Sequence, residues 1–150
     1  MTTAKAILLG GATVTVVDGL DAYLFWKLYR GVPGLGVFRG VMVGAFGPAA
    51  REGGLRTGLM GLGVHMLVAF SVVATFILLS RALPALRRPW LLWGPLYGIA
   101  VYCFMYYVVM PATPIGWPPF RPVPFINNIL IHMLGVGVPA AFFASRVDPA

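Results

Sequence analysis

Hydrophobic and polar positions along the chain separate into four long apolar runs, divided by stretches that are rich in basic residues, glycine and proline. The apolar runs cover about residues 6–26, 59–80, 90–110 and 125–145. A transmembrane helix needs about 20 mostly apolar residues, and each run reaches that length. Because backbone groups in lipid must be hydrogen-bonded within their own segment, each run is predicted to be helical. The pattern therefore predicts an all-α transmembrane four-helix bundle that forms a single domain over residues 1–150.

The connections between the predicted spans differ in character. Residues 81–89 form a short basic loop, and residues 111–124 contain six prolines, which predicts a stiff, non-helical segment. The longest connection, residues 31–57, includes the apolar stretch "LGVFRGVMVGAFG", which is too short to span a membrane. A short interfacial helix is predicted there. Its apolar face would consist of Leu35, Phe38, Met42 and Phe46.

Composition supports the membrane assignment. Hydrophobic residues make up 59% of the chain and charged residues 10%, whereas about a quarter of a soluble domain is charged. The net charge of +7 comes from Lys and Arg residues that flank the apolar runs, which indicates anchoring at lipid headgroups and argues against a nucleic-acid partner. The chain has one cysteine, Cys103, which excludes an internal disulfide and a cysteine-based zinc site.

The distribution of basic residues bears on orientation. An even number of spans places both termini on one side of the membrane. Five Lys and Arg residues fall on that side and six on the other, but the short 81–89 loop has the densest charge. Short loops weigh most in the positive-inside rule, so the termini are predicted to be cytoplasmic.

Both histidines of the chain and both carboxylates within the apolar runs fall at one depth. Measured from the side that carries the long and the proline-rich loops, Asp21, His65, His132 and Asp18 lie roughly 8, 9, 10 and 12 Å inside, at about 1.5 Å of rise per residue. These four residues come from three different spans. They are therefore predicted to form a buried Asp/His cluster in one half of the bilayer. Neighbouring polar residues at this depth are Asn128 and Tyr102.

Charge at this depth costs about 2.5–3.5 kcal/mol per residue on insertion scales, so a cluster of ionisable residues there indicates a role. Several roles are open. Asp18, Asp21, His65 and His132 are suitable ligands for a divalent metal ion. Alternatively, His65 and His132 are candidate axial ligands of a haem. An Asp/His chain also relays protons, and a ligand-free polar knot fixes the register of helices. No nucleophile with an adjacent base is evident, so enzymatic activity is not indicated.

Two function hypotheses follow. In the first, the cluster is a cation, haem or proton site. In the second, the chain is a non-catalytic accessory or assembly subunit of a larger membrane complex or a homo-oligomer, which the short loops and the lack of a soluble domain favour. The "HM" pair in "GVHMLVAF" and "LIHMLGVG" suggests a 2+2 helix repeat.

The spans also carry a family resemblance. The segments concerned are "VVDGLDA", "GPAAREGGLRTGLMGLGVHMLVAF", "YGIAVYCFMYYVVMP" and "NNILIHML". In these the chain resembles a group of small bacterial inner-membrane proteins that are broadly YagU-like. The group has no established chemistry, so the resemblance implies a multi-pass location in the bacterial inner membrane and adds no mechanism.

Overall fold

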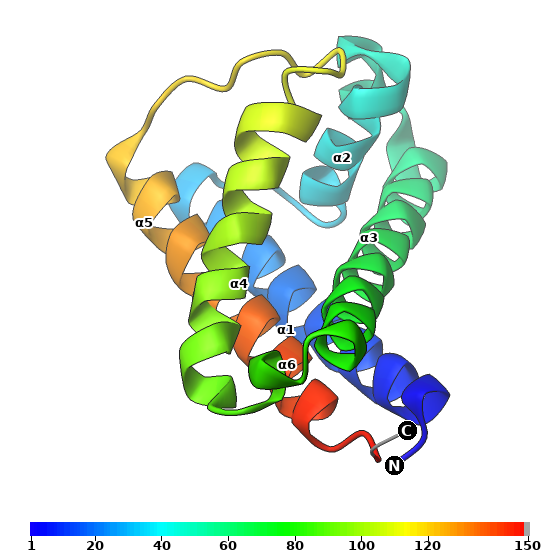
Figure 1. Ribbon diagram of the computed structural model, residues 1–150. Coiled ribbons are helices and arrows are strands. Elements are labelled where there is room, and N and C mark those ends of the chain that lie inside the picture. Colours follow the sequence, from blue (N-terminus) through cyan, green and yellow to red (C-terminus); the bar gives the residue numbers. More distant parts are fainter. Residues whose placement is uncertain (149–150) are drawn as a thin grey trace.

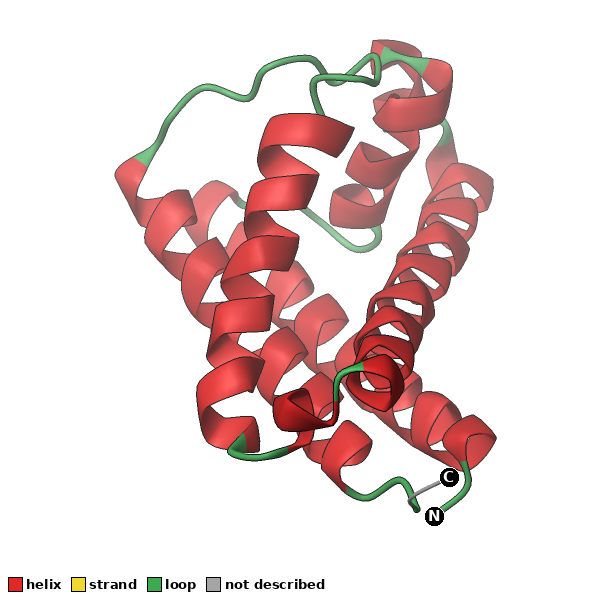
Figure 2. Cartoon of the chain, in the orientation of Figure 1, coloured by secondary structure: helices red, strands yellow, loops and turns green. Residues whose placement is uncertain are grey.

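The computed structural model describes residues 1–148, which fold into helices joined by turns and loops (Figures 1 and 2). Short 3₁₀ helices at Pro48–Glu52 and Pro84–Arg87 lie in two of the connections. Helical rods extend through π-helical turns at Met105–Val109 and His132–Gly137. The α-helices are α1 (Thr3–Arg30), α2 (Gly36–Phe46), α3 (Gly54–Ala82), α4 (Trp90–Phe104), α5 (Pro122–Ile131) and α6 (Val138–Ser145).

Four rods are long and apolar enough to cross a membrane: α1, α3, α4 with its π turn, and the continuous Pro122–Ser145 rod. The predicted all-α architecture with four such helices is confirmed, whereas the 2+2 repeat stays a prediction. The ends differ from the predicted boundaries. Helix α1 continues past Trp26 to Arg30, where Gly31 adopts the left-handed conformation (φ 65°) and donates its N–H to the Lys27 carbonyl at 3.0 Å.

The short helix expected in the first connection is present as α2, but it packs against protein. Phe38 and Met42 are 5% and 4% exposed, while Phe46 at the end of the predicted apolar face is 59% exposed. The backbone of Phe38 touches α3 at Gly61, where a side chain would collide with the Phe38 carbonyl. Half of the predicted apolar face of α2 is therefore buried against α3.

The proline-rich connection is non-helical up to Arg121, as predicted, but α5 already begins at Pro122. Proline has no N–H to lose in the first turn of a helix, and its fixed φ suits that position. The last prolines of the connection therefore start the helix.

The closely packed core lies at the end of the bundle that carries the termini. There Tyr97 of α4 donates a hydrogen bond of 2.7 Å to the carbonyl of Val72 in α3. Towards the other end α3 and α4 separate, and α2 lies between them (Figure 1). The core is rich in small side chains, which let helices approach closely. Its members are Ala6, Val14, Ala69, Val73, Phe76, Ile77, Val136, Ala140, Ala141, Ala144 and Val147.

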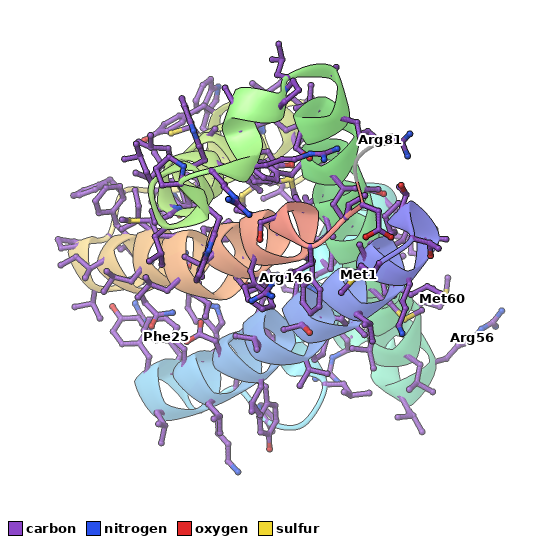
Figure 3. All side chains as sticks on the ribbon, turned by 60° about the horizontal axis from the view of Figure 1, so that its bottom comes forward. Met1, Phe25, Arg56, Met60, Arg81 and Arg146 are labelled. Carbon is purple, nitrogen blue, oxygen red and sulfur yellow. The ribbon has the colours of Figure 1, made fainter. Side chains whose placement is uncertain are left out.

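The outside of the bundle is apolar and its ends are polar. Large side chains such as Leu8, Leu67 and Leu134 are at least 60% exposed along the rods. At one end the Met1 amino group donates to the Arg146 carbonyl at 2.8 Å, and the two residues lie together in Figure 3. Arg56, at the start of α3, extends away from the ribbon in the same view. An apolar girdle with basic ends is the surface that a bilayer requires.

A proline lies two residues after the end of each π-helical turn. Pro111 follows the turn that ends at Val109, and Pro139 follows the turn that ends at Gly137. A proline within a helix cannot donate to the carbonyl four residues earlier, and its ring clashes with that carbonyl. Pro139 lies within the helix, and widening the preceding turn relieves this clash. Pro111 lies just beyond the end of its helix.

Candidate functional site

A cavity of about 330 Å³ lies between α1, α3, α4 and the Pro122–Ser145 rod. Five of the six residues singled out in the sequence line it, and Asp21 does not. The remaining lining is mostly valine, methionine and aromatic side chains. The five polar residues are Asp18, His65, Tyr102, Asn128 and His132.

Asp18 and His65 face each other from α1 and α3. The ring Nε2 of His65 lies 3.2 Å from the Thr15 carbonyl, and its Nδ1 lies 3.8 Å from Oδ2 of Asp18. A carbonyl only accepts hydrogen bonds, so Nε2 carries the proton, and Nδ1 of the neutral ring is a lone pair that faces a carboxylate. The Nδ1–Oδ2 distance exceeds the 2.7–3.2 Å or so of a direct hydrogen bond. The pair is therefore open to a bridging proton donor or cation.

Close packing allows this arrangement. Gly19 lies on α1 beside His65, and a Cβ added there would lie 3.0 Å from the ring Nε2. The imidazole also packs against the Phe38 ring, with 5.6 Å between the ring centroids. The side chains of His65 and Asp18 are 13% and 22% exposed. The ring is thus positioned by the α1 backbone and by an aromatic side chain of α2.

Asp21 has a different partner from Asp18. Its Oδ2 accepts a hydrogen bond of 2.8 Å from Nδ2 of Asn127 in α5. Residues three apart on a helix differ by about 60° in direction, which is enough for one carboxylate to reach α3 and the other α5. Sequence reasoning selected Asn128 and overlooked Asn127. An adjacent position lies about 100° away around the helix, and depth alone does not distinguish the two.

His132 and Tyr102 form the opposite wall of the cavity. Nδ1 of His132 donates at 2.8 Å to the Asn128 carbonyl one turn earlier, which leaves Nε2 as a lone pair. The imidazole and the Tyr102 ring are nearly perpendicular, at 5.6 Å between centroids, and Tyr106 stacks on the Tyr102 ring at 4.9 Å. Tyr102 is 2% exposed, yet its hydroxyl has no hydrogen-bond partner among the protein atoms described. Both His132 and Tyr106 lie in the π-helical turns, which often mark functional sites.

The prediction of one buried cluster of Asp18, Asp21, His65 and His132 is wrong. All four are partly exposed, and they form an Asp18–His65 pair, an Asp21–Asn127 pair and a separate His132. The prediction fixed depth along each helix but not rotation about its axis. Within residues 1–148, no three His, Cys, Asp or Glu side chains are close enough to share a metal ion.

The haem hypothesis concerns the free nitrogens of the two imidazoles. Haem ligation requires one free ring nitrogen on each axial histidine. Nε2 of His65 is bonded to the Thr15 carbonyl and its Nδ1 faces Asp18, while His132 keeps Nε2 free. Axial ligation by both histidines stays a prediction.

Glycines bring α4 against the π-helical turn that carries His132. A Cβ on Gly98 would collide with the His132 carbonyl, and one on Gly137 with the Gly94 carbonyl. Sequence reasoning missed this contact, although Gly94 and Gly98 are spaced as in the small-xxx-small pattern of membrane helix pairs. The contact holds the backbone of His132 directly against α4.

Comparison of the chain with protein-family models, with curated proteins and with solved structures finds no match. The YagU-like resemblance therefore stays a prediction, and the function rests on the geometry of the cavity.

Proposed function

We propose that this chain is a multi-pass membrane protein that binds a small cation in its intramembrane cavity, with Asp18 as the counter-charge. The observation that carries the proposal is the Asp18 carboxylate, which faces the cavity 3.8 Å from Nδ1 of His65. None of the residues that line the cavity is Lys or Arg. An isolated carboxylate at this depth is costly, and a bound cation or a proton on the pair offsets its charge.

The membrane setting has support of its own. Four helices are long and apolar enough to cross, and they expose large apolar side chains on their outer faces. We infer an inner-membrane location with cytoplasmic termini from the resemblance and from the basic loop that includes Arg81, Arg87 and Arg88. Reporter fusions placed after Asp148 and within residues 111–121 test the orientation. A reporter that is active only outside the cytoplasm is expected to be silent in the first fusion and active in the second.

Thermal unfolding in detergent tests cation binding. The protein is melted in Na⁺, K⁺, Mg²⁺ and Mn²⁺ chlorides at constant ionic strength and pH, as wild type and as Asp18→Asn. A cation at a hundredfold excess over its Kd stabilises the folded state by about 2.7 kcal/mol. We expect at least one cation to raise the Tm of wild type and not that of Asp18→Asn.

Asp21→Asn is the matched control, since Asp21 lies on the same helix but pairs with Asn127 outside the cavity. It is expected to keep the cation response of wild type. If no inorganic or organic cation separates wild type from Asp18→Asn, Asp18 is not a cation site and the proposal fails.

A further inference from the structure

We propose that the cation taken by this cavity is a small organic ammonium ion, with its charged group at Asp18 and its apolar body against Tyr102 and Tyr106. This inference rests on the proposed cation binding and specifies the ligand class. The cavity volume of about 330 Å³ falls at the small end of the roughly 300–1,000 Å³ of pockets that hold organic ligands. It is far larger than one bare ion requires.

The lining of the cavity favours an organic ion over an inorganic one. Ca²⁺ takes about six to eight oxygen ligands and Mg²⁺ about six in an octahedron, whereas Asp18 is the only carboxylate in this lining. Most of the other side chains are apolar or aromatic. An alkylammonium ion needs one counter-charge, gains from the faces of aromatic rings, and buries its carbon atoms against apolar walls.

Tyr102 independently indicates a ligand. Its ring is almost completely buried and lines the cavity, and its hydroxyl finds no partner among the protein atoms described. The large majority of buried hydroxyl groups are hydrogen-bonded. The described part of the fold does not supply a partner for this one. An ammonium group bound at Asp18 supplies that partner when it donates a second N–H to the Tyr102 hydroxyl oxygen.

The hydrogen-bonding capacity of the two walls specifies the ligand further. Asp18 offers carboxylate oxygens, and His132 offers the lone pair on Nε2, because its Nδ1 is bonded to the Asn128 carbonyl. Nδ1 of His65 is likewise a lone pair in the neutral ring. Acceptors therefore exceed donors, and the complementary ligand carries several N–H groups and a positive charge. Stacked Tyr102 and Tyr106, at 4.9 Å, give the apolar wall against which its body packs.

The experiment compares 2-phenylethylammonium with 2-phenylethanol, which has a closely similar shape and no charge, and with Na⁺ and K⁺. Tm is followed against concentration at fixed pH and ionic strength for wild type, Tyr102→Phe, Asp18→Asn and Asp21→Asn. We expect 2-phenylethylammonium to raise the Tm of wild type saturably and well above the effect of the alcohol. Tyr102→Phe is expected to weaken its apparent affinity by roughly 2- to 10-fold, Asp18→Asn by about tenfold or more, and Asp21→Asn not at all.

The outcomes separate this inference from the proposed function. If Na⁺ or K⁺ raises the Tm of wild type but not that of Asp18→Asn, and 2-phenylethylammonium raises the Tm of wild type no more than the alcohol does, the ligand class is wrong and cation binding stands. An undiminished affinity in Tyr102→Phe also overturns the ligand placement. If no cation distinguishes the two proteins, both proposals fall. Should Asp18→Asn not fold, the wild-type comparison of ammonium with alcohol and the Tyr102→Phe affinity decide the matter.

Discussion

Nε2 of His65 lies 3.2 Å from the backbone carbonyl of Thr15, so a side chain of α3 is bonded to the main chain of α1 in the middle of the bundle. This contact fixes which nitrogen faces Asp18. Thr15 and Asp18 are one turn apart on α1, and the imidazole bridges that turn. The main-chain hydrogen bond thereby orients the lone pair of Nδ1 towards the cavity carboxylate.

The two histidines are predicted to be opposite tautomers. His65 donates through Nε2 to Thr15, and His132 donates through Nδ1 to Asn128, because both partners are carbonyls. ¹⁵N spectra of histidine-labelled protein in detergent, at a pH where both rings are neutral, are expected to show one ring of each type. His132→Gln assigns the signals. Two rings of the same tautomer would contradict the geometry of the cavity.

Gly19→Ala is predicted to displace the His65 ring. The added Cβ would lie 3.0 Å from Nε2, tighter than nine in ten real contacts, so the imidazole has to shift by a few tenths of an ångström and its hydrogen bond to the Thr15 carbonyl is disturbed. The ¹⁵N signature of His65 is expected to change while that of His132 stays the same. Gly63→Ala, on an open face of α3, serves as the control and should leave both signals unchanged.

Two tyrosines on α4, the partly buried Tyr97 and the buried Tyr102, are predicted to respond differently to loss of their hydroxyl groups. Tyr97 donates to the Val72 carbonyl at 2.7 Å, so Tyr97→Phe should lower the free energy of unfolding by about 0.5–1.5 kcal/mol. Tyr102 has no hydrogen-bond partner among the atoms described, so Tyr102→Phe in ligand-free protein should be neutral or slightly stabilising. Unfolding titrations with SDS in mixed micelles measure both. Equal losses would show that the Tyr102 hydroxyl is bonded within the fold.

The sequence predicted the spans well because hydropathy is summed over a whole helix. The depth of Asp18 and His65 followed from the same pattern, since the rise per residue of a helix is fixed. The partner of each side chain depends on rotation about the helix axis and on neighbouring glycines, which single-sequence patterns do not determine. This explains why the predicted cluster separated into pairs, and why Asn127 was overlooked in favour of its neighbour Asn128.

The Asp21–Asn127 contact is predicted to contribute to stability as a pair. In a double-mutant cycle with Asp21→Ala and Asn127→Ala, we expect a coupling energy between about 0.6 kcal/mol, the average measured for hydrogen bonds between membrane helices, and about 1.7 kcal/mol, the maximum. The control is a second cycle that combines Asp21→Ala with Asn128→Ala, because the cavity-lining Asn128 makes no bond to Asp21. A coupling near zero in the first cycle, or an equal one in the second, would contradict this pairing.

Gly98→Ala is predicted to be strongly destabilising, although alanine is normally the better helix former by up to about 1 kcal/mol. The methyl group would collide with the His132 carbonyl, which belongs to the backbone of a packed helix and has little freedom to move. Forcing the two helices apart is expected to cost about 1–3 kcal/mol, as for other overpacked positions. Gly63→Ala, a helical glycine with no atom within 4 Å of the added carbon, should instead be neutral or stabilising. SDS unfolding of both variants decides this, since a mild effect at Gly98 would mean that α4 does not rest on the turn carrying His132.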